Sequence, residues 1–258
     1  MVLQVAESIG KRVLALCDVF GLFFIFLCEV LIALITTRLR LRKLFEQMRF
    51  VGVDSINIIL LTGAFSGAVL ALQSYIGFKR FGAEEFIGPV VALSLTRELG
   101  PVLTGLMVTG RAGSAIAAEI GTMQITEQID ALKTLTINVN QYLMVPRILG
   151  SVIIMPFLTV FSMMCGIIGG YVISVYVLNL NGEQYISGIK SFLEFSDITG
   201  GLIKSSVFGL ILSWVGCYKG YYTSGGAKGV GIATTQSVVT ASILILISNY
   251  FLATMLFK

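Results

Sequence analysis

Long stretches without a charged residue divide the chain into apolar segments. Residues 55–78, 148–182 and 229–257 contain no Asp, Glu, Lys or Arg. Each stretch exceeds the roughly 20 residues that a helix needs to cross the hydrocarbon core of a bilayer. Lipid cannot satisfy backbone hydrogen bonds, and the stretches are too long for barrel strands, so they predict transmembrane helices.

Two further apolar stretches are interrupted by charge. Residues 86–110 are apolar except for Arg97 and Glu98, and residues 198–218 are apolar except for Lys204. Both are long enough to span a bilayer. The sequence therefore predicts an all-α integral membrane protein with five transmembrane helices, at about 55–78, 86–110, 148–175, 200–218 and 237–257.

A shorter apolar segment, residues 19–35, precedes these spans and contains Glu29. At about 17 residues it is at the lower limit for a span, so it forms either a sixth transmembrane helix or a helix lying in the interface. No small-residue cleavage site follows it before the next basic cluster, which disfavours a cleaved signal peptide.

The basic residues set the orientation. A cluster precedes the first span, and Glu46 is the only acidic residue between its first and last members. The positive-inside rule places this cluster in the cytoplasm. Residues 111–147 and 219–236 are then cytoplasmic, and residues 79–85 and 179–197 face the other side. The members of the cluster are Arg38, Arg40, Arg42, Lys43 and Arg49.

Composition supports a membrane protein and excludes several classes. Hydrophobic residues make up 56% of the 258 residues and charged residues only 12%, against about 25% charged in soluble chains. A soluble enzyme or a nucleic-acid binder is therefore disfavoured. The chain has no histidine, and its four cysteines are far apart, so we expect no metal site and no histidine-based catalysis.

Arg97 and Glu98 are the main candidates for function. A charged group inside a span costs at least about 2.5–3.5 kcal/mol on insertion scales. Such a pair forms either a polar spot on a translocation path, meeting a lipid head group, or a structural ion pair with a neighbouring helix. Lys204 is either a head-group contact or an interfacial anchor, and Gln73 and Tyr75 near the end of the first span present a similar choice.

The segment 119–135 between the second and third spans is amphipathic. Ile125, Ile129 and Leu132 share one helical face. Glu119, Glu127 and Asp130 outnumber the single Lys133, whereas helices that lie on anionic lipid are usually rich in Lys and Arg. The acidic balance favours docking to a protein partner.

Small residues recur every four positions just before this segment. They form two ridges that allow another helix to approach closely, either within the chain or in a partner. One ridge contains Gly110, Ser114 and Ala118, and the other contains Gly113, Ala117 and Gly121.

The sequence contains no signature of an enzyme. The pattern G-x-x-x-x-G-K-[ST] is absent, and the glycine-rich segment 224–231 lacks its spacing. No intramembrane pair of carboxylates and no G-x-S-x-G motif is present either. We therefore expect no catalytic residues and no cofactor in this chain, and any ATP that drives it is bound by another subunit.

The residues 92–102, ALSLTRELGPV, resemble the family of MlaE-type ABC permeases. The resemblance continues through GRAGSA at 110–115, AEIGTM at 118–123 and TEQIDAL at 126–132. Gly67, Leu72 and Gln73 upstream and LIKS at 202–205 downstream extend it.

The resemblance implies a fold and a set of partners. Such permeases are homodimers of the bacterial inner membrane, with five spans and an N-terminal interfacial helix per subunit. On this basis we assign residues 1–50 to an interfacial helix and basic segment, and residues 51–258 to the permease transmembrane domain. The implied partners are a cytoplasmic ABC ATPase, a periplasmic hexamer of MCE-domain proteins and, in some systems, a STAS-domain regulator.

The resemblance also implies a substrate and site residues. The substrate class is phospholipid or a related lipid, moved between inner and outer membranes to maintain outer-membrane lipid asymmetry. Arg97 and Glu98 would lie at or near the lipid pocket, with Gln73, Tyr75 and Lys204 towards its outer side. Segment 119–135 would contain the coupling helix that meets the ATPase, through Glu119, Ile125, Glu127, Ile129, Asp130 and Leu132.

Two rival functions remain open from the sequence. One is a secondary transporter driven by an ion gradient, with Arg97 and Glu98 as its gating or proton site. The other is a passive membrane anchor for a periplasmic complex. Costly charges inside a span make a pure anchor less attractive.

Overall fold

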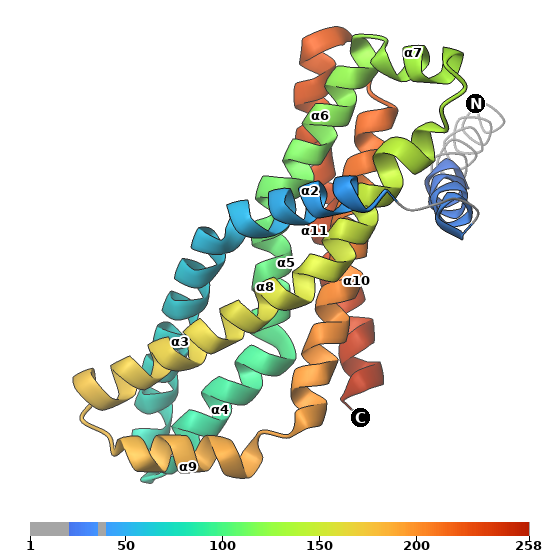
Figure 1. Ribbon diagram of the computed structural model, residues 1–258. Coiled ribbons are helices and arrows are strands. Elements are labelled where there is room, and N and C mark those ends of the chain that lie inside the picture. Colours follow the sequence, from blue (N-terminus) through green and yellow to red (C-terminus); the bar gives the residue numbers. More distant parts are fainter. Residues whose placement is uncertain (1–20, 36–39, 258) are drawn as a thin grey trace, which may run out of the picture.

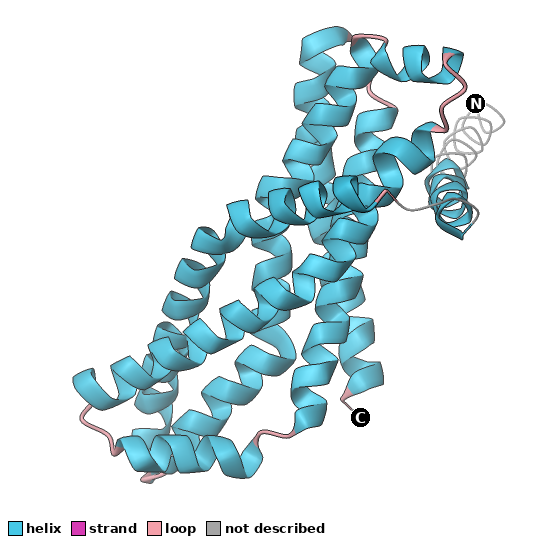
Figure 2. Cartoon of the chain, in the orientation of Figure 1, coloured by secondary structure: helices cyan, strands magenta, loops and turns pink. Residues whose placement is uncertain are grey.

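The computed structural model describes residues 21–35 and 40–257, and every regular element in these ranges is helical (Figures 1 and 2). Five helical stretches are long and apolar enough to cross a membrane. This confirms the predicted all-α membrane protein with five transmembrane helices. The stretches are Leu41–Phe81, Glu84–Ile125, Asn140–Val177, Phe195–Tyr221 and Gly226–Leu256.

Three of the five stretches consist of shorter segments joined end to end. The first contains α2 (Leu41–Gly52), η1 (Val53–Ser55), α3 (Ile56–Phe78) and η2 (Lys79–Phe81). The second contains η3 (Glu84–Phe86), α4 (Ile87–Ser94), η4 (Leu95–Leu99), α5 (Gly100–Val108), η5 (Thr109–Gly113) and α6 (Ser114–Ile125). The third contains η6 (Asn140–Met144), α8 (Val145–Val172) and η7 (Ile173–Val177).

The last two stretches are single helices, α10 (Phe195–Tyr221) and α11 (Gly226–Leu256). Two short helices connect the stretches at opposite ends of the molecule (Figure 1). Helix α7 (Gln128–Thr134) joins the second stretch to the third, and α9 (Gly182–Phe192) joins the third to the fourth. Under the positive-inside orientation, α7 is cytoplasmic and α9 is on the opposite side.

Helices α3 and α8 pack against each other through backbone rather than side chains. A Cβ atom added to Gly67 would overlap the carbonyl oxygen of Gly166, and one added to Gly63 would lie 2.6 Å from the carbonyl oxygen of Ser162. In a membrane, helices associate mainly through such close packing, because lipid is as apolar as their side chains. The small residues therefore hold the first span against the third.

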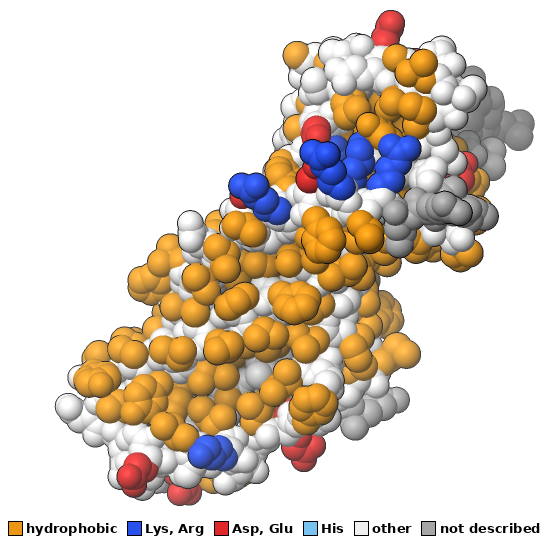
Figure 3. Space-filling model, viewed as in Figure 1, with side chains coloured by type: hydrophobic (Ala, Val, Ile, Leu, Met, Phe, Trp, Pro, Cys, Tyr) orange, Lys and Arg blue, Asp and Glu red, His pale blue; other side chains and the backbone are white. Residues whose placement is uncertain are grey.

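A broad face of exposed apolar side chains covers the body of the molecule (Figure 3). It is bounded by basic residues over α2 and by acidic residues near α9. An apolar surface of this extent is expected where the chain contacts lipid. Exposed members on α3, α8 and α11 include Phe65, Val69, Phe157, Ile168, Ile243 and Phe251.

The N-terminal apolar segment forms a helix over Gly21–Ile35. Fifteen residues at 1.5 Å each give about 22 Å, which is short of the roughly 30 Å of hydrocarbon. Phe26 is buried in the core cluster at this end, and Phe23 stacks on Trp214 of α10 with ring centroids 3.9 Å apart. The described helix is thus a short element packed on the bundle. Residues 1–20 and 36–39 of the predicted N-terminal segment lie outside the described residues.

The two ridges of small residues have different surroundings. A Cβ added to Gly216 of α10 would lie 3.0 Å from the carbonyl oxygen of Gly113, and one added to Gly220 would lie 2.9 Å from that of Ala117. The ridge of Gly113, Ala117 and Gly121 therefore packs inside the chain, against α10. Gly110 of the other ridge is exposed, and a Cβ added there would have nothing within 4 Å among the described residues.

Candidate functional site

A π-helical turn, η4, interrupts the second transmembrane helix and carries Arg97 and Glu98. Pro101 follows within the first two residues of α5. Proline has no N–H, so the carbonyl of Arg97, four residues earlier, lacks its usual helical donor. The Nζ atom of Lys204 on α10 donates to this carbonyl at 2.9 Å. The lysine therefore replaces the hydrogen-bond donor that the proline lacks. Turns of this π-helical kind are frequent at functional sites.

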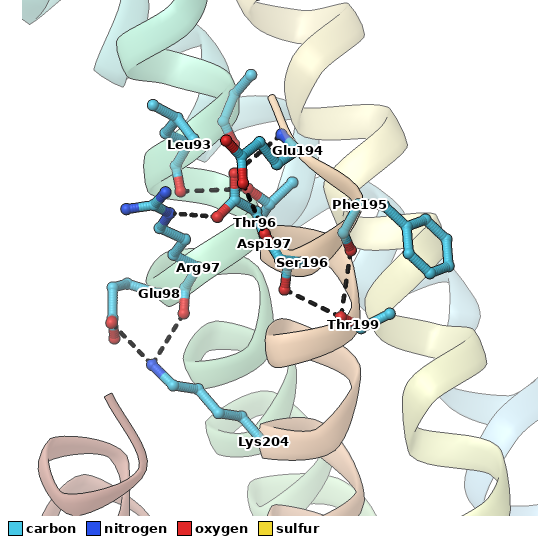
Figure 4. Close-up of polar contacts among 11 residues, drawn as sticks. Leu93, Thr96, Arg97, Glu98, Glu194, Phe195, Ser196, Asp197, Thr199 and Lys204 are labelled. Carbon is cyan, nitrogen blue, oxygen red and sulfur yellow. Dashed lines mark hydrogen bonds and ion pairs between the residues drawn. The ribbon is translucent and has the colours of Figure 1, made fainter. Parts of the chain in front are cut away.

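Arg97 forms an ion pair with Asp197 on α10. Its Nε donates to Oδ1 of Asp197 at 2.7 Å (Figure 4). The Asp197 side chain is only 2% exposed, whereas that of Arg97 is 41% exposed. Asp197 also accepts a hydrogen bond from the backbone N–H of Glu194 at 3.1 Å, within the capping box that begins α10. One carboxylate therefore both starts the fourth span and orients the arginine.

Glu98 forms a second ion pair, with Lys204. The Nζ atom of Lys204 lies 2.7 Å from Oε1 of Glu98, and the lysine side chain is completely buried. The other carboxylate oxygen, Oε2, accepts from Nδ2 of Asn249 on α11 at 2.9 Å. The carboxylate of Glu98 in the second span thereby accepts hydrogen bonds from both the fourth and the fifth span.

These contacts decide between alternatives that the sequence left open. Arg97 and Glu98 each pair with a neighbouring helix, so the structural ion pair is present at both. The ammonium group of Lys204 is buried between Glu98 and the Arg97 carbonyl. Glu98 has a partner at each oxygen and is 39% exposed, and Arg97, at 41%, keeps further N–H donors for a ligand.

An aromatic ring lies over both cations. The Phe257 ring centroid is 5.3 Å from Cζ of Arg97 and 4.9 Å from Nζ of Lys204. Gly200 permits this approach, since a Cβ there would lie 2.6 Å from the ring. A cation within about 6 Å of an aromatic ring centroid is attracted to the face of the ring. With two cations and two carboxylates, the cluster of Arg97, Glu98, Asp197 and Lys204 is neutral overall, and we call it the charged cluster.

Gln73 and Tyr75 do not join the charged cluster. Both are on α3, where the Tyr75 ring centroid lies 5.1 Å from Nζ of Lys79. Gln73 lines an open groove of about 420 Å³ between α3 and α5, together with Leu99 and Leu103. The groove is largely apolar, and none of the four residues of the charged cluster lines it. Its remaining lining residues are Phe65, Ser66, Val69 and Leu70.

The amphipathic segment folds as the end of α6, a tight turn and α7. Ile129 is completely buried and Leu132 packs on the same core cluster, so the apolar face of α7 turns towards its own chain. Ile125, at the end of α6, is half-buried. The turn places Glu127 in the left-handed region, with φ of 58°.

The acidic residues of this segment differ in their contacts. Glu119 forms an ion pair with Arg147 of α8, with 2.9 Å between Oε2 and Nη2. Asp130 pairs with Lys133 at 2.9 Å on the surface, and this hydrogen bond raises the pKa of Lys133. Glu127 and Asp130 remain exposed. Any partner at this end of the molecule meets the polar face of α7, not the apolar one.

Two residues of the site are absent from the sequence-based prediction, Asp197 and Asn249. Asp197 falls in a stretch that the sequence assigns to the outer segment, although Glu194 and Asp197 flank the start of an apolar run at the spacing of a capping box. Asn249 is an uncharged residue in the last span and gives no signal. Among the described residues, no group of three or more His, Cys, Asp or Glu could hold a metal ion.

Fold and site together define a polytopic membrane protein with paired charges at membrane depth, an arrangement typical of transport proteins. Comparison with known proteins gives the family. Residues 44–255 match the family described as Permease MlaE. The chain is 50% identical over 258 residues to a probable ABC transporter permease protein of Rickettsia bellii, covering all of both chains.

More distant relatives have more specific names. The chain is 36% identical to the intermembrane phospholipid transport system permease protein MlaE of Haemophilus influenzae, over 100% of this chain and 99% of the relative. It is 36% identical over 230 residues to the chloroplastic trigalactosyldiacylglycerol 1 protein of Arabidopsis thaliana, over 89% of this chain and 66% of the relative. The chain belongs to the MlaE permease family, as the resemblance in its sequence implied.

Proposed function

We propose that this protein is the membrane-spanning subunit of an ABC transporter that moves phospholipids or related lipids between the inner and outer membranes of a bacterium. In this role it maintains the lipid asymmetry of the outer membrane. The observation that carries the proposal is Arg97, a partly exposed cation that a buried carboxylate holds in the second span. The name of the Haemophilus relative supports phospholipid as the substrate class.

Arg97 is suited to a phosphate group. Its Nε donates to Asp197, and a guanidinium has four further N–H donors in a planar arrangement that matches phosphate oxygens. The ion pair fixes the side chain before a ligand arrives, which reduces the entropy lost on binding. Lipid acyl chains would follow the groove that Leu99, Leu103 and Gln73 line.

The energy source would be a separate cytoplasmic ABC ATPase, which binds the ATP. We place its contact on the exposed polar face of α7, around Glu127 and Asp130. Helix α6, which directly precedes α7, is the last part of the helical stretch Glu84–Ile125. The same stretch contains Arg97. Movement of α7 by the ATPase would therefore be transmitted along one helix to the charged cluster.

The remaining partners follow from the family. We propose a homodimer in the bacterial inner membrane, bound to a periplasmic hexamer of MCE-domain proteins and, in some systems, to a STAS-domain regulator. The exposed apolar side chains of α3 and α11 supply surface for contact with a second subunit or with lipid. Nucleic acid is not among the proposed partners.

Reconstitution tests the proposal. The permease and its co-purified ATPase are placed in proteoliposomes, and the transfer of fluorescent phospholipid to an acceptor is followed with and without ATP. We expect ATP-dependent transfer that Arg97→Gln reduces about tenfold and Arg97→Lys reduces less, with unchanged ATPase content in both variants. Transfer driven by an ion gradient without the ATPase would favour the secondary transporter. A complex with no bound lipid and no transfer would favour the passive anchor.

A further inference from the structure

A polar cavity lies apart from the charged cluster, where α2, α6 and the start of α8 meet. It has a volume of about 280 Å³. Lys43, Glu46 and Gln47 line it from α2, Glu119 from α6, Tyr142 from η6 and Arg147 from α8. Under the positive-inside orientation, this junction is at the cytoplasmic border of the membrane.

Arg147 is buried in the wall of this cavity, and two of its three nitrogen atoms have partners. Its side chain is 5% exposed, and Nη2 pairs with Glu119 while Nη1 donates to the carbonyl of Leu143 at 2.8 Å. Among the described residues, neither Nε of Arg147 nor Oε1 of Gln47 has a hydrogen-bond partner, and both atoms are buried. Buried polar groups almost always have partners, and an exception calls for an explanation such as an absent ligand.

The charge around the cavity favours an anion. The carboxylate of Glu119 is taken by Arg147, and that of Glu46 pairs with Arg42 at 3.3 Å. Lys43 has no carboxylate within ion-pair distance among the described residues, and its Nζ lies 3.1 Å from the ring centroid of Tyr142. Arg40 lies over the same ring, with Cζ 4.9 Å from the centroid. The basic excess of α2 is therefore directed at the mouth of the cavity.

The surroundings of α2 indicate where the anion comes from. Leu41 and Phe45, four residues apart on α2, are 61% and 63% exposed, while Lys43 is on the opposite side of the helix. An amphipathic helix of this kind lies at the boundary between head groups and acyl chains. The mouth of the cavity is then at the level of lipid phosphates.

We propose that this cavity binds the head group of a phospholipid from the cytoplasmic leaflet, with its phosphate held by Lys43. The bound lipid would link α2 to α6, which leads directly into α7. This site is separate from the proposed transport path, and the inference does not depend on the proposed function.

Binding is tested with the full-length permease, purified with its ATPase in a neutral detergent. Thermal unfolding is followed while short-chain phosphatidylglycerol is added, to give an apparent Kd. Lys43→Gln removes the cation at the cavity, and Arg49→Gln is the matched control, because it makes the same charge change at an exposed residue of α2 that does not line the cavity. Two further titrations are run at equal ionic strength. Diacylglycerol tests acyl chains without a phosphate, and sodium phosphate tests the phosphate without acyl chains.

We expect Lys43→Gln to weaken phosphatidylglycerol binding about tenfold, the size of one lost hydrogen bond between charged groups, and Arg49→Gln to leave it within about twofold. A response to sodium phosphate alone that Lys43→Gln abolishes supports the anion site with a free ion as its source. Equal losses in both variants, an equal response to diacylglycerol, or no response at all would overturn the proposal. Loss of lipid binding on adding excess ATPase would also overturn it, because the cavity would then be a protein docking site.

Discussion

The ammonium group of Lys204 lies 2.7 Å from the carboxylate of Glu98, with the lysine side chain completely buried. Glu98→Gln removes the counter-charge and leaves the lysine buried. We expect this variant to lose about 3–5 kcal/mol of stability, as is typical when one partner of a buried ion pair is removed. Thermal unfolding of the purified variants in the same detergent measures the loss.

The double variant Glu98→Gln, Lys204→Met is the control for this pair. Removing both charges leaves no unpaired ion, so we expect the double variant to be more stable than Glu98→Gln alone. If the stability losses of Glu98→Gln and of Lys204→Met measured alone add up to the loss of the double variant, the contact between Glu98 and Lys204 has no coupling energy.

Asp197 has two functions that two substitutions can separate. Asp197→Asn keeps an oxygen that accepts from the N–H of Glu194 but removes the charge that pairs with Arg97. Asp197→Ala removes both. We expect Asp197→Ala to be less stable than Asp197→Asn by about 1 kcal/mol, the usual contribution of a helix cap. Equal stability of the two variants would show that the capping bond contributes nothing.

The contact of α3 with α8 predicts a strong effect of a single methyl group. Gly67→Ala would place Cβ against the carbonyl of Gly166, so the helices must separate. Overpacking of this kind costs about 1–3 kcal/mol or more. Gly77→Ala is the matched control on the same helix, because nothing lies within 4 Å of its Cβ position among the described residues. A lower unfolding temperature for Gly67→Ala alone is expected.

The proposed ATPase contact predicts a charge effect at one end of the molecule only. We expect Glu127→Lys to reduce the amount of ATPase that co-purifies with the permease several-fold, because Glu127 is exposed beside α7. Glu183→Lys makes the same change on α9 at the opposite end (Figure 1) and should leave co-purification unchanged. Retention of full ATPase binding by Glu127→Lys would argue against this docking surface.

The spans could be predicted from the sequence because charge is excluded from lipid over a fixed length. The partners of the charged residues could not. Asp197 is 100 residues from Arg97, and Asn249 is 151 residues from Glu98, so only the packing of the second, fourth and fifth spans brings them together. Spacing along one helix carries no information about such pairs.

The side of a helix that faces inward could not be predicted from local pattern either. Ile129 and Leu132 form an apolar face that the sequence alone leaves available to a partner, but the structure buries it against the chain's own core. Lys204 looks like a residue at the start of a span, yet α10 begins at Phe195 and places the lysine more than two turns inside. The capping box at Glu194 starts this helix earlier than the predicted span at about residue 200. Every later residue of α10 is therefore further from the start of the helix than expected.

The distance in sequence between Arg97 and Asp197 has a consequence for biosynthesis. At about 5–20 residues per second, a ribosome needs roughly 5–20 s to add the 100 residues that separate them. During that interval the nascent second helix carries Arg97 and Glu98 with neither Asp197 nor Lys204 yet made. We therefore expect the insertion machinery to shelter this helix until the fourth one emerges, and the bundle to close around its charges late in synthesis.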